Sequence, residues 1–135
     1  MGESVENVCG SFDKVYTIEL CPKLAQKAIQ KFTKESHVHV IQGDSSLKMP
    51  DICKELDLPT FFWLDGHWSG GNTARGPVDC PLLEECRAIA DHCKVEAVIA
   101  IDDVRLFDKK LGEDWTGITK EKILKVFEQR TKSVR

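Results

Sequence analysis

The spacing of apolar residues along the chain changes between the pattern of a strand and the pattern of a helix. Four short runs rich in β-branched, aromatic or continuous apolar residues predict strands at 14–20, 37–42, 60–64 and 97–101. Between and after these runs, apolar residues recur at helical spacing, which predicts helices over 22–34, 47–56, 82–93 and after 119. Strands that alternate with helices favour a parallel α/β sheet with right-handed crossovers.

Two of the predicted strands are apolar without interruption. The runs TFFWL at 60–64 and AVIAI at 97–101 lack the polar alternation of a half-exposed strand. We therefore expect both strands to be buried on two faces, with 60–64 central in the sheet. The helix after Pro81 is expected to bury one face, formed by Leu82, Leu83, Cys86, Ile89, Ala90 and Cys93.

Each predicted strand ends in an acidic residue: Glu19, Asp44, Asp65 and Asp102. In parallel α/β sheets, ligands bind beyond the carboxyl ends of the strands, so these acids are expected to converge on one crevice. Glu19 can accept hydrogen bonds from the two hydroxyls of a ribose; the alternative is that it caps the next helix or stays in solvent. Asp44 can cap the helix that follows it, which is compatible with an adenine contact.

Asp65, Asp102 and Asp103 form a second group of candidate residues. Hard divalent cations prefer carboxylate oxygens, so these aspartates could hold a Mg²⁺-like ion; the alternative is a helix cap and a solvent-exposed acid. His67 adds a group that titrates near neutral pH and can act as a base or a metal ligand, or remain an ordinary surface histidine.

The loop 68–76 combines glycines with an aromatic residue and an arginine, a composition suited to closing over a small polar ligand or to a plain surface loop. The chain contains neither a Gly-x-x-x-x-Gly-Lys-Ser/Thr pattern nor a Gly-x-Gly-x-x-Gly pattern. Nucleotide hydrolysis of the P-loop type is therefore not supported.

Composition narrows the class of protein. The 135 residues carry a formal net charge of −3 with 41% hydrophobic and 30% charged residues, which fits one domain and offers no basic surface for nucleic acid. No apolar run is long enough to cross a membrane, so the cytoplasm is the expected compartment. The six cysteines form no Cys-x-x-Cys pair and are expected to be reduced core thiols rather than disulfides or zinc ligands.

Four motifs occur in the order VYTIEL, VIQGDSS, FFWLDGHWSGG and IAIDD, and together they resemble class I S-adenosylmethionine-dependent methyltransferases. The resemblance covers most of 14–107. The stretches LDGHWSGGNTARGPVDCPLLEE and IDDVRLF are its most specific parts and resemble a group of small bacterial methyltransferase-like proteins. The implied fold is a Rossmann-like, mostly parallel methyltransferase sheet.

The resemblance also implies roles for individual residues. Glu19 would bind the ribose hydroxyls of S-adenosylmethionine, Asp44 and Ser45 would lie at its adenine, and Asp65 with Gly66 would flank its methionine part. Similarity to metal-assisted O-methyltransferases implies a divalent ion such as Mg²⁺ at Asp65, Asp102 and Asp103. That ion would hold an oxygen of a small-molecule substrate, while His67 or a neighbouring carboxylate receives its proton.

The chain departs from the family pattern at both ends, where the first strand with its Gly-rich loop and the last two strands are expected but not found. Residues 1–135 are therefore expected to form a single partial domain, with 4–10 as the helix after that loop. Either the strands ending at Glu19 and Asp65 pair directly, or a second copy completes the sheet as a homodimer. The alternative functions are a non-catalytic remnant that binds a nucleoside-like ligand or itself, and a metal-dependent hydrolase.

Overall fold

A computed structural model describes residues 3–67 and 76–133. The chain divides into two compact units, Met1–Lys48 and Met49–Arg135, here called the N-terminal and the C-terminal unit. Each unit contains one parallel two-stranded sheet, so the predicted parallel α/β class is confirmed. Direct pairing of the strands that end at Glu19 and Asp65 would join the two units and stays a prediction.

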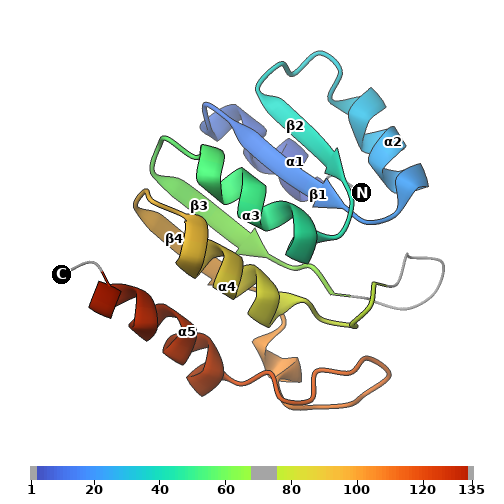
Figure 1. Cartoon of the computed structure of the whole chain (residues 1–135). Helices are drawn as coiled ribbons and strands as arrows, with labels where there is room; N and C mark the ends of the chain where they lie inside the picture. Colours follow the sequence, from blue (N-terminus) through green and yellow to red (C-terminus); the bar gives the residue numbers. More distant parts are fainter. Residues whose placement is uncertain (1–2, 68–75, 134–135) are drawn as a thin grey trace. The chain divides into compact units, whose positions relative to one another are not determined.

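The N-terminal unit is built around strands β1 (Val15–Glu19) and β2 (Val38–Gln42). They pair in parallel from Val15 opposite Val38 to Glu19 opposite Gln42, and Figure 1 shows them side by side. Helix α2 (Pro22–Lys31) connects the strands and contacts both. The unit also contains α1 (Glu3–Val8), the 3₁₀ turn η1 (Cys9–Ser11) and the first residues of α3 (Ser45–Glu55).

Local sequence explains where these elements begin. Pro22 occupies the first turn of α2, where its missing N–H and fixed backbone angle are tolerated. Gly43 ends β2 with a φ of 146°, a conformation that disfavours other residues. The predicted strands and helix of this unit are confirmed, each slightly shorter than expected.

The C-terminal unit contains β3 (Thr60–Leu64) and β4 (Ala97–Ile101), whose predicted bounds match the structure. The strands pair in parallel, with Leu64 opposite Ile101 at their carboxyl ends. Helix α4 (Leu82–His92) packs against α5 (Lys120–Ser133), and the 3₁₀ turn η2 (Val104–Leu106) follows β4. The core includes the fully buried Ile89, Cys86 and Cys53.

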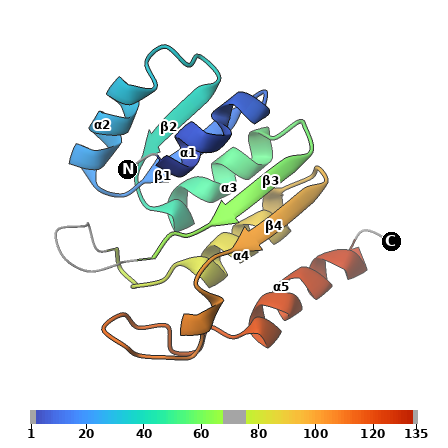
Figure 2. The same cartoon turned by 180° about the vertical axis from the view of Figure 1, so that it is seen from behind.

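The expectation that β3 and β4 are buried on both faces is wrong for this structure. Phe62 and Leu64 are buried, whereas Phe61 and Trp63 are 46% and 56% exposed, and Val98 of β4 is 64% exposed. The reason is that α4 covers only one face of this two-stranded sheet. In Figure 2, which views the opposite face, β3 and β4 lie in front of α4. The two strands are therefore apolar on both faces, although only one face is covered.

The buried face of α4 also differs in part from the sequence pattern. Leu82, Cys86 and Ile89 are buried as predicted, and so is Cys93 just after the helix. Leu83 and Ala90 are only half-buried, and their expected places in the core are taken by Glu85 and Ala88. Among the described residues, no helix combines the length and apolar character needed to cross a bilayer.

Candidate functional site

The ends of β3 and β4 bring three of the predicted aspartates together within the C-terminal unit. Asp65 follows β3, and Asp102 and Asp103 follow β4. The backbone N–H of Asp102 donates to the carbonyl of Leu64 at 3.0 Å, which extends the pairing of the strands to the point where the acids begin. Parallel pairing therefore sets the carboxylates at one edge of this sheet, as predicted.

His67 lies between these carboxylates. Its Nδ1 is 3.6 Å from Oδ1 of Asp65, and its Nε2 is 3.4 Å from Oδ2 of Asp103 and 3.6 Å from Oε2 of Glu113. The side chains of His67 and Asp103 are largely buried, at 12% and 14% exposure, whereas that of Asp65 is 45% exposed. The imidazole is thus placed to exchange a proton with a carboxylate or to share a cation with it.

Asp103 adopts a left-handed backbone conformation, with φ of 54° and ψ of 30°. Its N–H is oriented by Oδ1 of Asp102 at 2.7 Å, and its Oδ1 accepts from the guanidinium of Arg105. These contacts turn the Asp103 carboxylate so that its other oxygen faces His67. Asp102 influences the site in two ways: its carboxylate accepts from the N–H of Asp103, and its negative charge acts on Asp65.

The pKa of Asp65 is raised above its usual value, chiefly because partial burial removes water from the carboxylate. The negative charges of Asp102 and Asp103 raise this pKa further, and His67 opposes them. The site therefore concentrates like charges, and a bound cation would relieve the repulsion.

Glu113 and Trp115 are two site residues that the sequence patterns did not indicate. The indole N–H of Trp115 donates to Oε2 of Glu113 at 3.0 Å, and its ring centroid lies 5.2 Å from that of His67. The segment is held by Asp79, a buried residue whose Oδ2 accepts from the N–H of Asp114 at 3.0 Å. No motif signals this contact, because it depends on a loop returning to the ends of strands far away in sequence.

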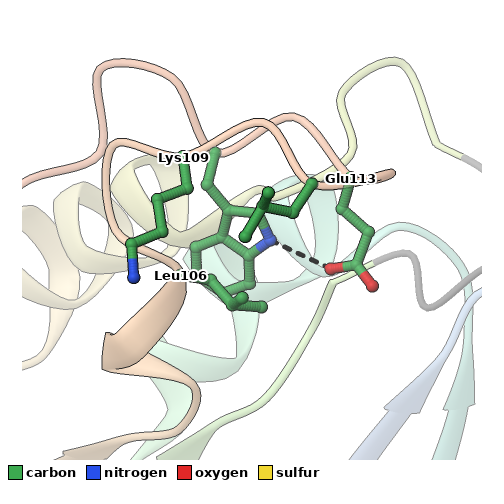
Figure 3. Close-up of a pocket in the computed structure, with 5 residues that line it drawn as sticks. Leu106, Lys109 and Glu113 are labelled. Atoms are coloured by element: carbon green, nitrogen blue, oxygen red, sulfur yellow. Dashed lines mark hydrogen bonds between the residues drawn. The ribbon is translucent and has the colours of Figure 1, made fainter.

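Trp115 also lines a small depression of about 30 Å³ together with Leu106, Lys109, Leu111 and Glu113. Figure 3 shows the residues that line this depression, with the hydrogen bond from the Trp115 indole to the Glu113 carboxylate drawn as a dashed line. This volume is far below the roughly 300–1,000 Å³ of pockets that enclose drug-sized ligands, so the depression does not enclose a nucleoside.

In the N-terminal unit, Glu19 and Asp44 lie at the ends of adjoining strands and bind local donors. Oε1 of Glu19 accepts from the N–H of Cys21 at 2.8 Å, at the start of α2. Oδ1 of Asp44 accepts from the N–H and the hydroxyl of Ser46, at 2.9 and 2.6 Å, at the start of α3. The predicted capping role of Asp44 is confirmed.

The predicted site residues thus fall into two groups. The C-terminal unit contains the residues that follow β3 and β4: Asp65, Gly66, His67, Asp102 and Asp103. The N-terminal unit contains Glu19, Asp44 and Ser45. Convergence of both groups on one crevice stays a prediction. The predicted ligand loop lies mostly outside the described residues, because 68–75 are not among them.

Comparison with known proteins found no match for this chain among family models, curated proteins or solved structures.

Proposed function

We propose that the chain is a methyltransferase-like domain that binds S-adenosylmethionine and transfers its methyl group to an oxygen of a small molecule. Support comes from the ordered motifs that resemble class I methyltransferases and from the parallel α/β pairing of all four described strands. The Rossmann-like arrangement of one continuous sheet is part of this proposal.

The observation that carries the proposal is the adjacency of Glu19 and Asp44. Glu19 ends β1, and its carbonyl accepts from the N–H of Gly43, the residue before Asp44, at 3.0 Å. Glu19 pairs with Gln42, so the two acids lie at the carboxyl ends of adjacent parallel strands, where such sheets bind ligands. Each carboxylate keeps acceptor positions besides those used for capping, because a carboxylate has about four lone-pair sites.

The C-terminal unit supplies the groups for proton removal. His67 is largely buried and flanked by carboxylates, so it can accept the proton of a substrate hydroxyl as a methyl group is transferred to the oxygen. The donor set around it also fits a divalent cation, which would be held by Asp65 and Asp103, with Asp102 adjoining. Such an ion would lower the pKa of a substrate hydroxyl.

Calorimetric titration with S-adenosylmethionine and S-adenosylhomocysteine tests the cofactor role. We expect Glu19→Gln to weaken binding about tenfold, since it replaces charge-assisted hydrogen bonds with neutral ones but keeps an oxygen to accept from Cys21. Glu35→Gln is the matched control in the same unit and should bind as the parent does. Absence of heat at millimolar ligand, or equal affinity in Glu19→Gln, would reject the ribose site.

A metal-dependent hydrolase is the second candidate, favoured by the grouping of Asp65, His67 and Asp103. In that function the cation activates a water molecule instead of a substrate hydroxyl. Thermal melts with Mg²⁺, Mn²⁺ and Zn²⁺ test it, because a ligand that binds only the folded state raises the melting temperature. Binding of a metal without any binding of S-adenosylmethionine would favour the hydrolase over the methyltransferase.

A further inference from the structure

Asp65, His67 and Asp103 meet the geometric requirement for a common metal ion. Each offers one ligand atom, and the three atoms lie within 4.8 Å of one another. The three residues follow two hydrogen-bonded strands, β3 and β4, of one unit. The pairing of these strands holds the three side chains near one another. The group thus differs from the all-aspartate set expected from the sequence, since His67 takes the position expected for Asp102.

The distances approach, but at their widest exceed, the ligand spacing of a tetrahedral site. Zinc bonds of about 2.0–2.2 Å to imidazole nitrogen and carboxylate oxygen separate two ligand atoms by about 3.3–3.6 Å. His67 stands 3.4 Å from Asp103 and 3.6 Å from Asp65, through different ring nitrogens. One ion binds one ring nitrogen. An ion on Nδ1 would leave Nε2 facing Glu113, and the widest pair of ligand atoms, up to 4.8 Å apart, would have to close by about 1.2–1.5 Å.

We propose that Asp65, His67 and Asp103 bind one divalent transition-metal ion of the zinc type and leave its fourth position open for an oxygen of water or substrate. The proposal deepens the proposed function by naming the class of ion, and it rests on that function only for the substrate that fills the open position. With His67 as a ligand, a neighbouring carboxylate instead of His67 would receive the substrate proton. Three protein ligands with one open position is the arrangement of catalytic zinc.

The imidazole decides which ion the site prefers. Mg²⁺ favours six oxygen ligands and retains several waters, whereas imidazole nitrogen suits Zn²⁺ and other late transition metals. A set of one nitrogen and two carboxylates should therefore bind Zn²⁺ more tightly than Mn²⁺, and both more tightly than Mg²⁺.

Neighbouring side chains supply the charge and orientation that such a site needs. Arg105 pairs with Oδ1 of Asp103, which leaves Oδ2 toward His67. Glu113 faces Nε2 of His67 and is itself fixed by the indole of Trp115. A carboxylate beside a ligating histidine orients the ring and increases its basicity.

The first experiment is competition titration of the whole chain with Zn²⁺, Mn²⁺ and Mg²⁺ in the presence of a metal indicator. We expect one Zn²⁺ per chain, bound at least about 100-fold more tightly than Mg²⁺. The cysteines could also bind zinc, so the Cys9→Ser/Cys21→Ser variant, which removes the two that are only half-buried, serves as control and should keep its affinity. Loss of zinc binding in that variant, or equal affinity for Mg²⁺, overturns the proposal.

Variants of the ligands provide the second test. His67→Gln and Asp103→Asn should each weaken Zn²⁺ binding at least about 100-fold, more than loss of an outer partner does. His92→Gln, at the end of α4 in the same unit, is the matched control and should bind normally. Melting curves in EDTA verify folding, and Asp65→Asn at the most exposed ligand provides a third variant if His67→Gln unfolds. Unchanged zinc affinity in folded ligand variants overturns the site.

The same variants separate this proposal from the proposed function. Calorimetry with S-adenosylmethionine on Asp103→Asn measures the cofactor site independently of the metal. Zinc binding without S-adenosylmethionine binding rejects the methyltransferase and retains the metal site, and the reverse result rejects only the metal site.

Discussion

The two units use the same sequence pattern, a strand that ends in an acid, with opposite results. In the N-terminal unit, Glu19 and Asp44 each accept a hydrogen bond from the backbone N–H two residues further along the chain. In the C-terminal unit, Asp65 and Asp103 face a histidine and each other's charge instead. An acid at a strand end thus becomes a cap where an α-helix follows, and part of a charged cluster where a loop or a short 3₁₀ turn follows.

The units also differ in how much core they contain. Of the sixteen apolar residues buried within the described chain, only Ala25 and Phe32 belong to the N-terminal unit. The C-terminal unit holds the other fourteen, including Ile89 and Trp115. A unit with few buried apolar contacts opens locally at low free energy, so a ligand should influence the N-terminal unit more strongly.

The largest expected effect follows from removing core in the C-terminal unit. Ile89→Ala should lower the free energy of unfolding by about 2–5 kcal/mol, because Ile89 is fully buried and the change leaves a cavity. Ile29→Ala, at a half-exposed position of α2, should cost less than about 1 kcal/mol. Urea unfolding followed by tryptophan fluorescence measures the change in unfolding free energy for Ile89→Ala. Urea unfolding followed by backbone circular dichroism measures it for both variants. Equal losses of unfolding free energy in the two variants would contradict the difference in buried core between the units.

Hydrogen exchange should show the second effect. The amides of β1 and β2 are expected to exchange faster than those of β3 and β4, since every residue of β1 is only half-buried. S-Adenosylmethionine at 100 times its Kd should slow exchange in β1 and β2 by up to about 100-fold, corresponding to about 2.7 kcal/mol. Mass spectrometry of peptides resolves the strands. Protection confined to β3 and β4 would place the cofactor elsewhere.

A smaller effect is expected at Glu113, which acts through His67. Glu113→Gln should weaken zinc binding about 10- to 100-fold without changing the melting temperature in EDTA by more than a degree or two. Glu121→Gln, in the first turn of α5, is the control in the same unit. A lower melting temperature with unchanged zinc affinity would assign Glu113 a purely structural role.

The smallest effect concerns the charge of Asp65. Its folded-state pKa is raised above 3.8, so the native state disfavours the charged form, and this carboxyl contributes stability below pH 3.8 that is lost as pH rises through its folded pKa. In EDTA at pH 7, Asp65→Asn should therefore melt about 1–2 °C higher than the parent, corresponding to a few tenths of a kcal/mol. The difference should vanish in melts at pH 3.5. A variant that melts lower at pH 7 would show that the carboxylate stabilises the fold.

Short-range patterns in the sequence predicted the elements well. The bounds of β3 and β4 follow from apolar runs closed by aspartates. The helix predicted after 119 is α5, and Thr119 caps it, its hydroxyl accepting from the N–H of Lys122 at 3.3 Å. Exposure of Phe61 and Trp63 was not predictable, because an apolar run does not reveal how many layers cover a strand.

The candidate site was predicted in part. Asp65, His67 and Asp103 were identifiable from their places at strand ends, since parallel pairing brings such positions together. Glu113 and Trp115 were not, because their segment reaches the site through a long-range hydrogen bond to Asp79. Contacts of this kind leave no periodicity in a single sequence.

The left-handed backbone of Asp103 has a consequence for attempts to improve this protein. A residue other than glycine in that conformation costs of order 1 kcal/mol, and asparagine and glycine adopt it more readily than aspartate. A library selected for heat resistance should therefore enrich Asn or Gly at position 103 and discard the carboxylate. Selection for stability alone would remove a ligand of the proposed metal site, so such a campaign has to screen for zinc binding as well.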